Sequence, residues 1–452
     1  MVKKNDELEV LIDHMIFPNI GVALVDDKEI RIKGTLTGQR ANIRVTKKRT
    51  GKIEGKVIEI IEKSPMEIEK QCEHFGECGG CTYQNLTYND QLKLKEGQVK
   101  EIIDEVVENY EFLPIVESPS DTCYRNKMEF SFGDLQKDGE LSLGMHKKGS
   151  FYEVVTVSGC RIIDEDFKKV LLCVLDFFKG RGVTYYKTRN HEGYLRHLVV
   201  RKAHSTGQML VNLVTTTQSE VDLKPLVEKL TSLSLDGSIN GILHTLNDTL
   251  SDVVKSDETK LLYGDGYMTE KLLSLNFKIT PFSFFQTNSK GAEVLYNKVR
   301  EFVGDIDGKE IFDLYSGTGT IAQIMAPVAK KVTGIEIVEE ASQAAVENAK
   351  LNSLNNCHFI AGDVLKEIET LKGQKPDVII LDPPREGIHP KAIHKIIDFR
   401  CKEIVYVSCK PTSLAKDLEV FQARGYKVEK VQCVDMFPYT AHVETVVLMT
   451  RK

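Results

Sequence analysis

The chain of 452 residues lacks an apolar run near the roughly 18 residues that a membrane-spanning helix needs. Its first ten residues, MVKKNDELEV, have neither the apolar core nor the cleavage site of a secretory signal peptide. Internal repeats and low-complexity tracts are also missing. These absences predict a cytoplasmic protein that does not bind a membrane, and at roughly 150 residues per domain the length predicts about three domains.

Cysteine is too sparse for a dense disulfide framework, because the chain has 10 cysteines in 452 residues. Cytosolic thiols stay reduced, so a clustered set of cysteines indicates metal binding or catalysis. The formal net charge of −6 argues against a surface covered with nonspecific nucleic-acid contacts. A local basic surface remains compatible with that total.

Such a basic stretch occurs near the N-terminus, at residues 28–56. Its ten Lys or Arg and two Glu give +8. Within it, ANIRVTKKRTGKIEGKVIEII has two β-rich runs joined by a Lys/Arg-rich, Gly-containing connection, as in a hairpin. Residues 1–62 are therefore predicted to form a small OB-like β-barrel, a fold that often binds oligonucleotides, although a solvated basic hairpin would give the same pattern.

Two larger domains are predicted to follow. Residues 63–280 mix helix and strand, beginning with a predicted helix over 88–110 and continuing with strands such as KMEFSFG and RHLVVRKA. Residues 281–452 alternate strands with helices, which is typical of a doubly wound, Rossmann-like parallel sheet. The predicted fold class is α/β, with an α+β central domain.

The predicted C-terminal sheet carries acidic residues at successive strand ends. DLYSGTGT (313–320) is a strand that runs into a glycine turn, but it has neither the full dinucleotide fingerprint nor a phosphate-binding Lys. Glu336, Asp363 and Asp382 end the next three strands. Acidic groups along one crevice would surround a nucleoside without polyphosphate, so the sequence predicts S-adenosylmethionine (SAM) as cofactor. Turn-capping carboxylates are the alternative interpretation.

Cys409 and Glu444 also lie at predicted strand ends, and their chemistry suits one reaction. Uracil C5 accepts a methyl group only after a thiolate has added to C6, and a base must then remove the C5 proton. The sequence therefore predicts Cys409 as nucleophile and Glu444 as base. Alternatively, Cys409 is a small buried residue and Glu444 a surface carboxylate.

The chain resembles the RNA uracil-5-methyltransferase family through five motifs in the family's order and spacing: FSFFQTN (282–288), DLYSGTGT, LDPPREG (381–387), VSCKP (407–411) and HVET (442–445). The resemblance implies a class I methyltransferase domain, an N-terminal TRAM domain and formation of 5-methyluridine. It adds Gln286 and Tyr315 to the residues around SAM. One departure is Lys410 where family members commonly have Asn; a nearby ammonium would lower a thiol pKa.

Three cysteines are clustered in CEHFGECGGC, and a fourth lies far along the chain. Cys72, Cys78, Cys81 and Cys160 could hold an iron–sulfur cluster, and four thiolates would equally suit structural zinc. The resemblance favours 4Fe–4S, which rRNA-directed family members carry with this spacing. The expected partner is therefore RNA, most specifically 23S rRNA, bound by a monomer.

Three rival interpretations remain from the sequence. The substrate could be the T-loop uridine of tRNA, the chain could be a noncatalytic RNA-binding protein, or it could be a cytosine-5 RNA methyltransferase. In the middle of the chain, YRNKMEFSFG and GYLRHLVVRKA mix basic and aromatic residues, which predicts either RNA contacts or a sheet with one solvated face. Phe284 and Phe285 are predicted to stack on the target base.

Overall fold

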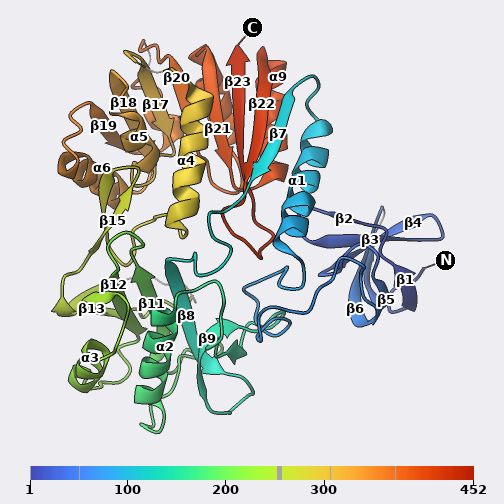
Figure 1. Ribbon diagram of the computed structural model, residues 1–452, viewed down its shortest axis with the longest axis vertical. Coiled ribbons are helices and arrows are strands. Elements are labelled where there is room, and N and C mark those ends of the chain that lie inside the picture. Colours follow the sequence, from blue (N-terminus) through green and yellow to red (C-terminus); the bar gives the residue numbers. More distant parts are fainter. Residues whose placement is uncertain (1, 50, 252–256, 306, 372, 452) are drawn as a thin grey trace.

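The computed structural model describes residues 2–49, 51–251, 257–305, 307–371 and 373–451. In this part of the chain the strands form three larger sheets and one hairpin (Figure 1). No helix there combines the length and the apolar character that crossing a membrane requires.

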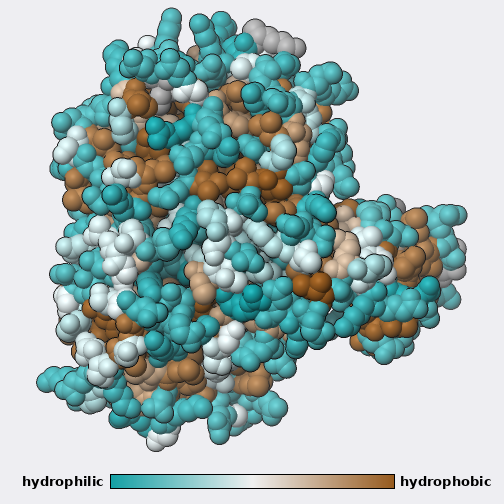
Figure 2. Space-filling model, viewed as in Figure 1, coloured by the Kyte–Doolittle hydropathy of each residue, from teal (hydrophilic) through white to brown (hydrophobic). Residues whose placement is uncertain are grey.

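The N-terminal sheet is a curled, six-stranded structure that projects from the rest of the molecule (Figure 2). In spatial order its strands are β1 (Glu7–Leu11), β5 (Arg40–Arg49), β6 (Lys52–Glu62), β4 (Lys28–Lys33), β3 (Ile20–Val25) and β2 (His14–Ile16). β5 and β6 pair antiparallel, as the hairpin pattern predicted. Alternate residues such as Ala41, Ile43 and Val45 point into its own small core. This sheet fits the predicted barrel-like domain.

The central sheet has seven strands among the described residues, and a separate hairpin follows it. The strands are β10 (Val154–Val155), β9 (Leu141–His146), β8 (Lys127–Asp134), β11 (Leu195–Lys202), β12 (Gln208–Thr215), β13 (Ser238–Leu246) and β14 (Glu258–Gly264), with the hairpin β15 (Met268–Leu272) and β16 (Leu275–Ile279). Helices α2 (Glu165–Phe178) and α3 (Lys224–Thr231) pack on one face and bury Phe167, Val170 and Leu226.

The C-terminal sheet has eight strands in this part of the chain. Their order is β19 (Cys357–Ala361), β18 (Lys331–Glu336), β17 (Glu310–Leu314), β20 (Val378–Leu381), β21 (Glu403–Ser408), β23 (Glu444–Arg451), β22 (Tyr426–Val434) and β7 (Glu111–Val116). β19 to β21 run parallel, but β23 is antiparallel to both of its neighbours. The α/β class is therefore confirmed, and the sheet is mixed rather than wholly parallel.

Helices cover both faces of this sheet. They are α1 (Tyr88–Asp104), α4 (Ser289–Val303), α5 (Thr320–Met325), α6 (Glu339–Leu351), α7 (Val364–Glu367), α8 (Pro390–Asp398) and α9 (Pro411–Ala423). Along β20, Val378 and Ile380 pack with α4 and α5, whereas Ile379 and Leu381 pack with α1, α8 and α9. Two buried faces explain why β20 is a continuous apolar run without alternation.

The segment after the N-terminal sheet contributes to the C-terminal layer. The predicted helix over 88–110 ends earlier, because α1 stops at Asp104 and the chain turns at Asn109, where φ is 56°. It then forms β7, which pairs parallel with β22 at the sheet edge. Residues 88–116 therefore pack on the C-terminal sheet, although they precede the central sheet in the sequence (Figure 1).

Candidate active site

A pocket of about 1240 Å³ opens at the edge where the parallel strands of the C-terminal sheet end. β23 runs in the opposite direction, so its first residue reaches the same edge. All seven residues that the sequence predicted for catalysis and cofactor binding line this pocket: Gln286, Tyr315, Glu336, Asp363, Asp382, Cys409 and Glu444. The sheet thus brings together side chains that are far apart in the sequence.

The glycine turn after β17 forms one wall of the pocket. Its backbone is left-handed at Tyr315, Gly317 and Gly319, with φ of 68°, 54° and 70°. A Cβ at Gly319 would lie 2.5 Å from the Phe359 ring, so this position requires glycine. The turn brings the backbone close to the pocket, as a small ligand would need.

Glu336 lies across this turn, at the end of β18. Its carboxylate accepts hydrogen bonds from the backbone N–H groups of Gly317 and Val338, both at 2.9 Å. The neighbouring Ser316 hydroxyl is buried with no hydrogen-bond partner in the described structure. An oriented carboxylate and an unsatisfied hydroxyl beside an open pocket fit a polar, uncharged ligand surface such as the ribose of SAM.

Three carboxyl groups with raised pKa values lie in or beside the pocket: Asp382 and Glu444 line it, and Asp313 is buried where the charge of Asp382 acts on it. Burial, reinforced by Asp382, raises the pKa of Asp313 to about 7. Burial alone raises the pKa of Asp382 to about 7. Burial, with Asp382 again adding and Arg385 opposing, raises the pKa of Glu444 to about 8. Crowded, desolvated carboxyls favour a cation in the pocket, and SAM carries one on its sulfonium.

Cys409 follows β21 directly and precedes α9. Burial and the nearby Glu444 and Asp382 raise the pKa of its thiol to about 11, whereas hydrogen bonding and charge from Arg385 lower it. Lys410 is exposed at the N-cap of α9, and its side chain is not among the groups that shift this pKa. The cation that acts on the thiol is therefore Arg385, and the suggested effect of Lys410 is not seen.

The loop that carries Arg385, residues 383–388, is anchored on α9. The Ser413 hydroxyl of α9 donates to the Arg385 carbonyl at 2.7 Å. Asp417, one turn further along α9, accepts the Ile388 N–H at 2.9 Å. Helix α9, which begins after Cys409, thus anchors the loop that carries Arg385.

The two phenylalanines of FSFFQTN have different environments. Phe284 is 66% exposed and lines the pocket, so it can reach an incoming base. Phe285 is 6% exposed, and its ring lies 5.9 Å from that of Phe277 in the core. Both rings line the pocket, but Phe284 is the more accessible to a base, and Phe285 is also packed in the core; the stacking role stays a prediction.

Comparisons with known proteins agree with this geometry. A family model described as tRNA (Uracil-5-)-methyltransferase matches residues 243–452. An uncharacterized RNA methyltransferase of Clostridium tetani is 50% identical over 452 residues, which cover 100% of this chain and 99% of the relative. One from Caldanaerobacter subterraneus is 49% identical and covers 99% of each chain. The crystal structure of Pyrococcus abyssi tRNA (uracil-54, C5)-methyltransferase in complex with S-adenosyl-L-homocysteine is 26% identical, with a TM-score of 0.77 over 98% of this chain and 100% of that one.

The chain belongs to the tRNA (uracil-5-)-methyltransferase family. It is a SAM-dependent RNA (uracil-5-)-methyltransferase with the fold of that family. The noncatalytic and cytosine-5 interpretations of the sequence are thereby set aside.

The four predicted cluster cysteines of this methyltransferase converge on a second cavity, of about 400 Å³. Cys72, Cys78, Cys81 and Cys160 all line it. Among the described residues, no three His, Cys, Asp or Glu side chains stand close enough together to hold a metal ion. The thiols therefore surround one space without forming ligand geometry. His74, Glu129 and His442 line the same cavity, so the four thiols are its most numerous metal-binding type but not the only one among the described residues.

The two cavities share part of their walls. Arg125, Thr287 and His442 line both the active-site pocket and the cysteine cavity. Burial and the nearby Arg385 lower the pKa of His442 to about 4, so its imidazole is neutral at physiological pH. Sequence patterns did not single out these three residues, although each lies inside a quoted segment: Arg125 in YRNKMEFSFG, Thr287 in FSFFQTN and His442 in HVET.

The arginines and the lysine of β11 make contacts within the protein. Arg196 and Arg201 are 2% and 1% exposed. Arg196 donates to the Asn247 and Thr249 carbonyls, and Arg201 to the Pro281 and Ser283 carbonyls. Lys202 pairs with Asp164 and Asp166 at 2.8 and 2.7 Å. For GYLRHLVVRKA, the arginines therefore neither lie on a solvated face nor point outward toward a partner, because they bind carbonyls inside the protein.

The basic stretch 28–56 is also partly neutralised. Five of its ten cations have carboxylate partners in the described structure: Arg31, Arg40, Arg44, Lys47 and Lys52. These pairs are largely exposed and contribute little to stability, but they reduce the free positive charge of the surface.

Proposed function

We propose that this enzyme methylates C5 of a uridine in RNA with Cys409 as nucleophile and Glu444 as base. The observation that carries the proposal is the shared pocket, in which both residues lie with Asp382 and the glycine turn. SAM, when bound, supplies a methyl group on a sulfonium, and Gln286, Tyr315, Glu336, Asp363 and Asp382 would hold it.

The thiolate of Cys409 forms a bond to C6 of uracil, and the C5–C6 electron pair moves toward the O4 carbonyl. The resulting enolate carbon C5 takes up the methyl group. Glu444 then removes the C5 proton, the C5–C6 double bond re-forms, and the C6–sulfur bond breaks to release Cys409. Arg385 favours the thiolate in the first step. The raised pKa of Glu444 makes it a stronger base in the last step.

For the substrate we propose 23S rRNA. Support comes from the four cysteines around one cavity, which resemble the iron–sulfur subgroup of the family, and we propose a 4Fe–4S cluster held by Cys72, Cys78, Cys81 and Cys160. We also propose domains at residues 1–62, 63–280 and 281–452, with residues 88–116 of the second packing on the sheet of the third. The first, TRAM-like domain would bind RNA, and the protein would be a cytoplasmic monomer.

The T-loop uridine of tRNA is a second candidate substrate. It is favoured by the family description and by the solved relative, whose printed activity is on uracil-54 of tRNA. The two proposals share all of the chemistry and differ only in the RNA that is bound.

Mass mapping of 5-methyluridine in rRNA and tRNA from a deletion strain tests both proposals. The purified enzyme should then restore methylation of a 23S rRNA fragment from that strain and leave unmodified tRNA essentially unlabelled. Efficient labelling of the tRNA T-loop with none in 23S rRNA would overturn the substrate proposal and leave the chemistry standing. Absence of 5-methyluridine from both RNAs after incubation would contradict the reaction itself.

A further inference from the structure

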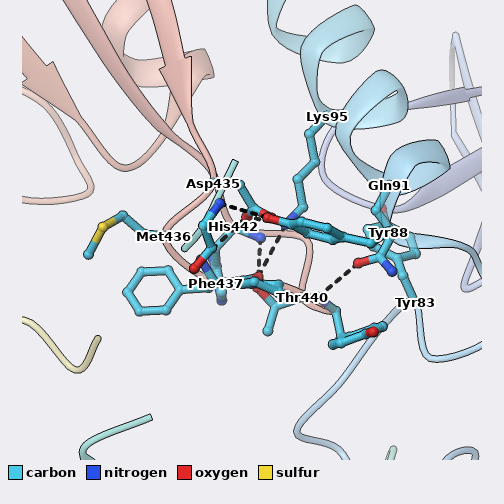
Figure 3. A network of polar contacts seen from close by, with 12 residues as sticks. Tyr83, Tyr88, Gln91, Lys95, Asp435, Met436, Phe437, Thr440 and His442 are labelled. Carbon is cyan, nitrogen blue, oxygen red and sulfur yellow. Dashed lines mark hydrogen bonds and ion pairs between the residues drawn. The ribbon is translucent and has the colours of Figure 1, made fainter. Parts of the chain in front are cut away.

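The segment 435–443, here called the strap, joins β22 to β23, whose first residue is Glu444. It has no strand or helix of its own, so its conformation depends on contacts with other parts of the chain. His442 lies near its end, beside the active-site pocket. Figure 3 shows the strap meeting α1 through a group of buried polar side chains.

The first contact is an ion pair that is hidden from solvent. The Lys95 ammonium on α1 lies 2.7 Å from the Asp435 carboxylate, and the two side chains are 1% and 0% exposed. Lys95 also donates to the Phe437 carbonyl at 3.1 Å, and Asp435 accepts the Phe437 N–H at 3.3 Å (Figure 3). The pair therefore fixes the backbone at Phe437 from both sides.

Neighbouring groups hold the next part of the strap. Gln91, one turn before Lys95 on α1, accepts the Tyr439 N–H at 2.8 Å. The Tyr439 carbonyl accepts the N–H groups of Thr82 and Tyr83, at 2.7 and 3.0 Å. Tyr439 itself is left-handed, with φ of 63°. A non-glycine residue keeps that conformation only where its surroundings impose it.

A buried ion pair such as Lys95–Asp435 contributes little to the free energy of unfolding, because desolvation offsets the attraction between the charges. Burial lowers the pKa of the Lys95 ammonium, because removing the charge from water is costly, and Asp435 opposes that shift. Well-packed apolar residues of similar volume often stabilise a fold as well or better. The feature that apolar residues could not reproduce is the pair of hydrogen bonds to Phe437.

We propose that Lys95 and Asp435 are positioning residues for the base, and that their contacts with the strap set Glu444 in the pocket for removal of the C5 proton. The role in proton removal rests on the proposed function of Glu444. The effect of Lys95 and Asp435 on the conformation of the strap does not rest on that function, and it can be measured separately.

Hydrogen exchange measured by mass spectrometry tests the hold on the strap without any substrate. In Lys95→Met, the amides of residues 436–443 should exchange at least about tenfold faster than in the wild type, while the β17 and β18 amides remain unchanged. Lys100→Met, an exposed position on the same helix, is the matched control and should leave the strap unaffected. Unchanged exchange in the strap would refute the proposal, whatever the enzyme methylates.

Adduct release tests the consequence for proton removal. In single turnovers, Lys95→Met should form the covalent Cys409–RNA adduct at a near-normal rate and release it at least about tenfold more slowly, since small misplacement of a reacting group costs that much or more. SAM affinity, measured by calorimetry, should stay within about twofold. The positioning role would be refuted if Lys95→Met released the adduct at the wild-type rate while Glu444→Gln accumulated it.

A second variant separates positioning from stability. Lys95→Met/Asp435→Leu removes both charges, so it should regain the melting temperature that Lys95→Met alone loses. Slow adduct release should persist in the double variant, because the hydrogen bonds to Phe437 are still missing. Recovery of both melting temperature and release rate would show that the pair serves folding alone. If the wild type itself forms no 5-methyluridine, the proposed function fails, and hydrogen exchange still decides whether the pair holds the strap.

Discussion

Replacing the proposed base, Glu444→Gln, should stabilise the free enzyme while it blocks turnover. Glu444 is 6% exposed and shares the pocket floor with Asp382. Burial raises its pKa from 4.5 to about 8, so folding favours its protonated form. Glutamine has almost the same shape and never ionises, so it avoids the cost of a buried charge.

The sign and size of the effect follow from that shift. Between pH 4.5 and about 8 the folded chain binds more protons than the unfolded chain, so the free energy of unfolding falls as pH rises through this window. At 1.36 kcal/mol per pKa unit, the ceiling at pH 8 is about 5 kcal/mol. Because buried sites relax and admit water, we expect about 2 kcal/mol. For a domain of this size that raises the melting temperature by about 4 to 8 °C.

Thermal unfolding of the wild type and Glu444→Gln at pH 5, 6, 7 and 8 measures this difference. The gain should be near zero at pH 5 and grow with pH. Glu386→Gln, at an exposed position in a pocket-lining loop, is the matched control and should show no such trend. A Glu444→Gln gain that is absent at pH 8, or equal at pH 5 and pH 8, would refute the reasoning.

Three further outcomes are expected. Cys409→Ala should still bind SAM, but its turnover should fall below about a hundredth of the wild-type rate, as expected for loss of a covalent catalyst. Methylation above about a hundredth of the wild-type rate would contradict the assignment of Cys409 as nucleophile. Protein purified without oxygen should be brown, with absorbance near about 400 nm, whereas a colourless protein with stoichiometric zinc would support the zinc alternative. Deleting residues 1–62 should weaken RNA binding at unchanged SAM affinity. Five cations of residues 28–56 have no carboxylate partner in the described structure. Losing them should make the plot of log affinity against log salt concentration less steep by at most about 3.5. An unchanged slope would argue against phosphate contacts in this stretch.

The C-terminal domain and its pocket were predictable because strand ends fix where side chains lie. Glu336 ends a parallel strand, and Asp382 and Cys409 each follow one, so the fold alone brings them to one edge. The strand that begins at Glu444 was predicted, but its antiparallel direction, which brings Glu444 to the same edge, was not. Periodicity within a strand says nothing about its direction relative to its neighbours.

Contacts between distant segments could not be read from local patterns. Lys95 lies in a helix among other charged residues, and only the fold shows that it is buried against Asp435, 340 positions away. Likewise, Arg196 and Arg201 look like RNA ligands in the sequence, but loops from elsewhere in the chain supply carbonyls that bind them. Composition identifies a cation, and only tertiary structure identifies its partner.

The charges around the pocket explain why such remote contacts are needed. Asp313, Asp382 and Glu444 would each gain from moving toward water, since burial raises the pKa of all three and the charge of Asp382 raises those of Asp313 and Glu444 further. Strands hold Asp313 and Asp382 in place, because each lies within or directly after a parallel strand. Glu444 instead begins its strand straight after an irregular segment, so repulsion could displace it by moving that segment. The buried Lys95–Asp435 pair, which is anchored on α1 away from the pocket, opposes this displacement without placing a cation beside the base. A cation next to Glu444 would lower its pKa and weaken it as a base, whereas a remote anchor keeps both the position and the basicity.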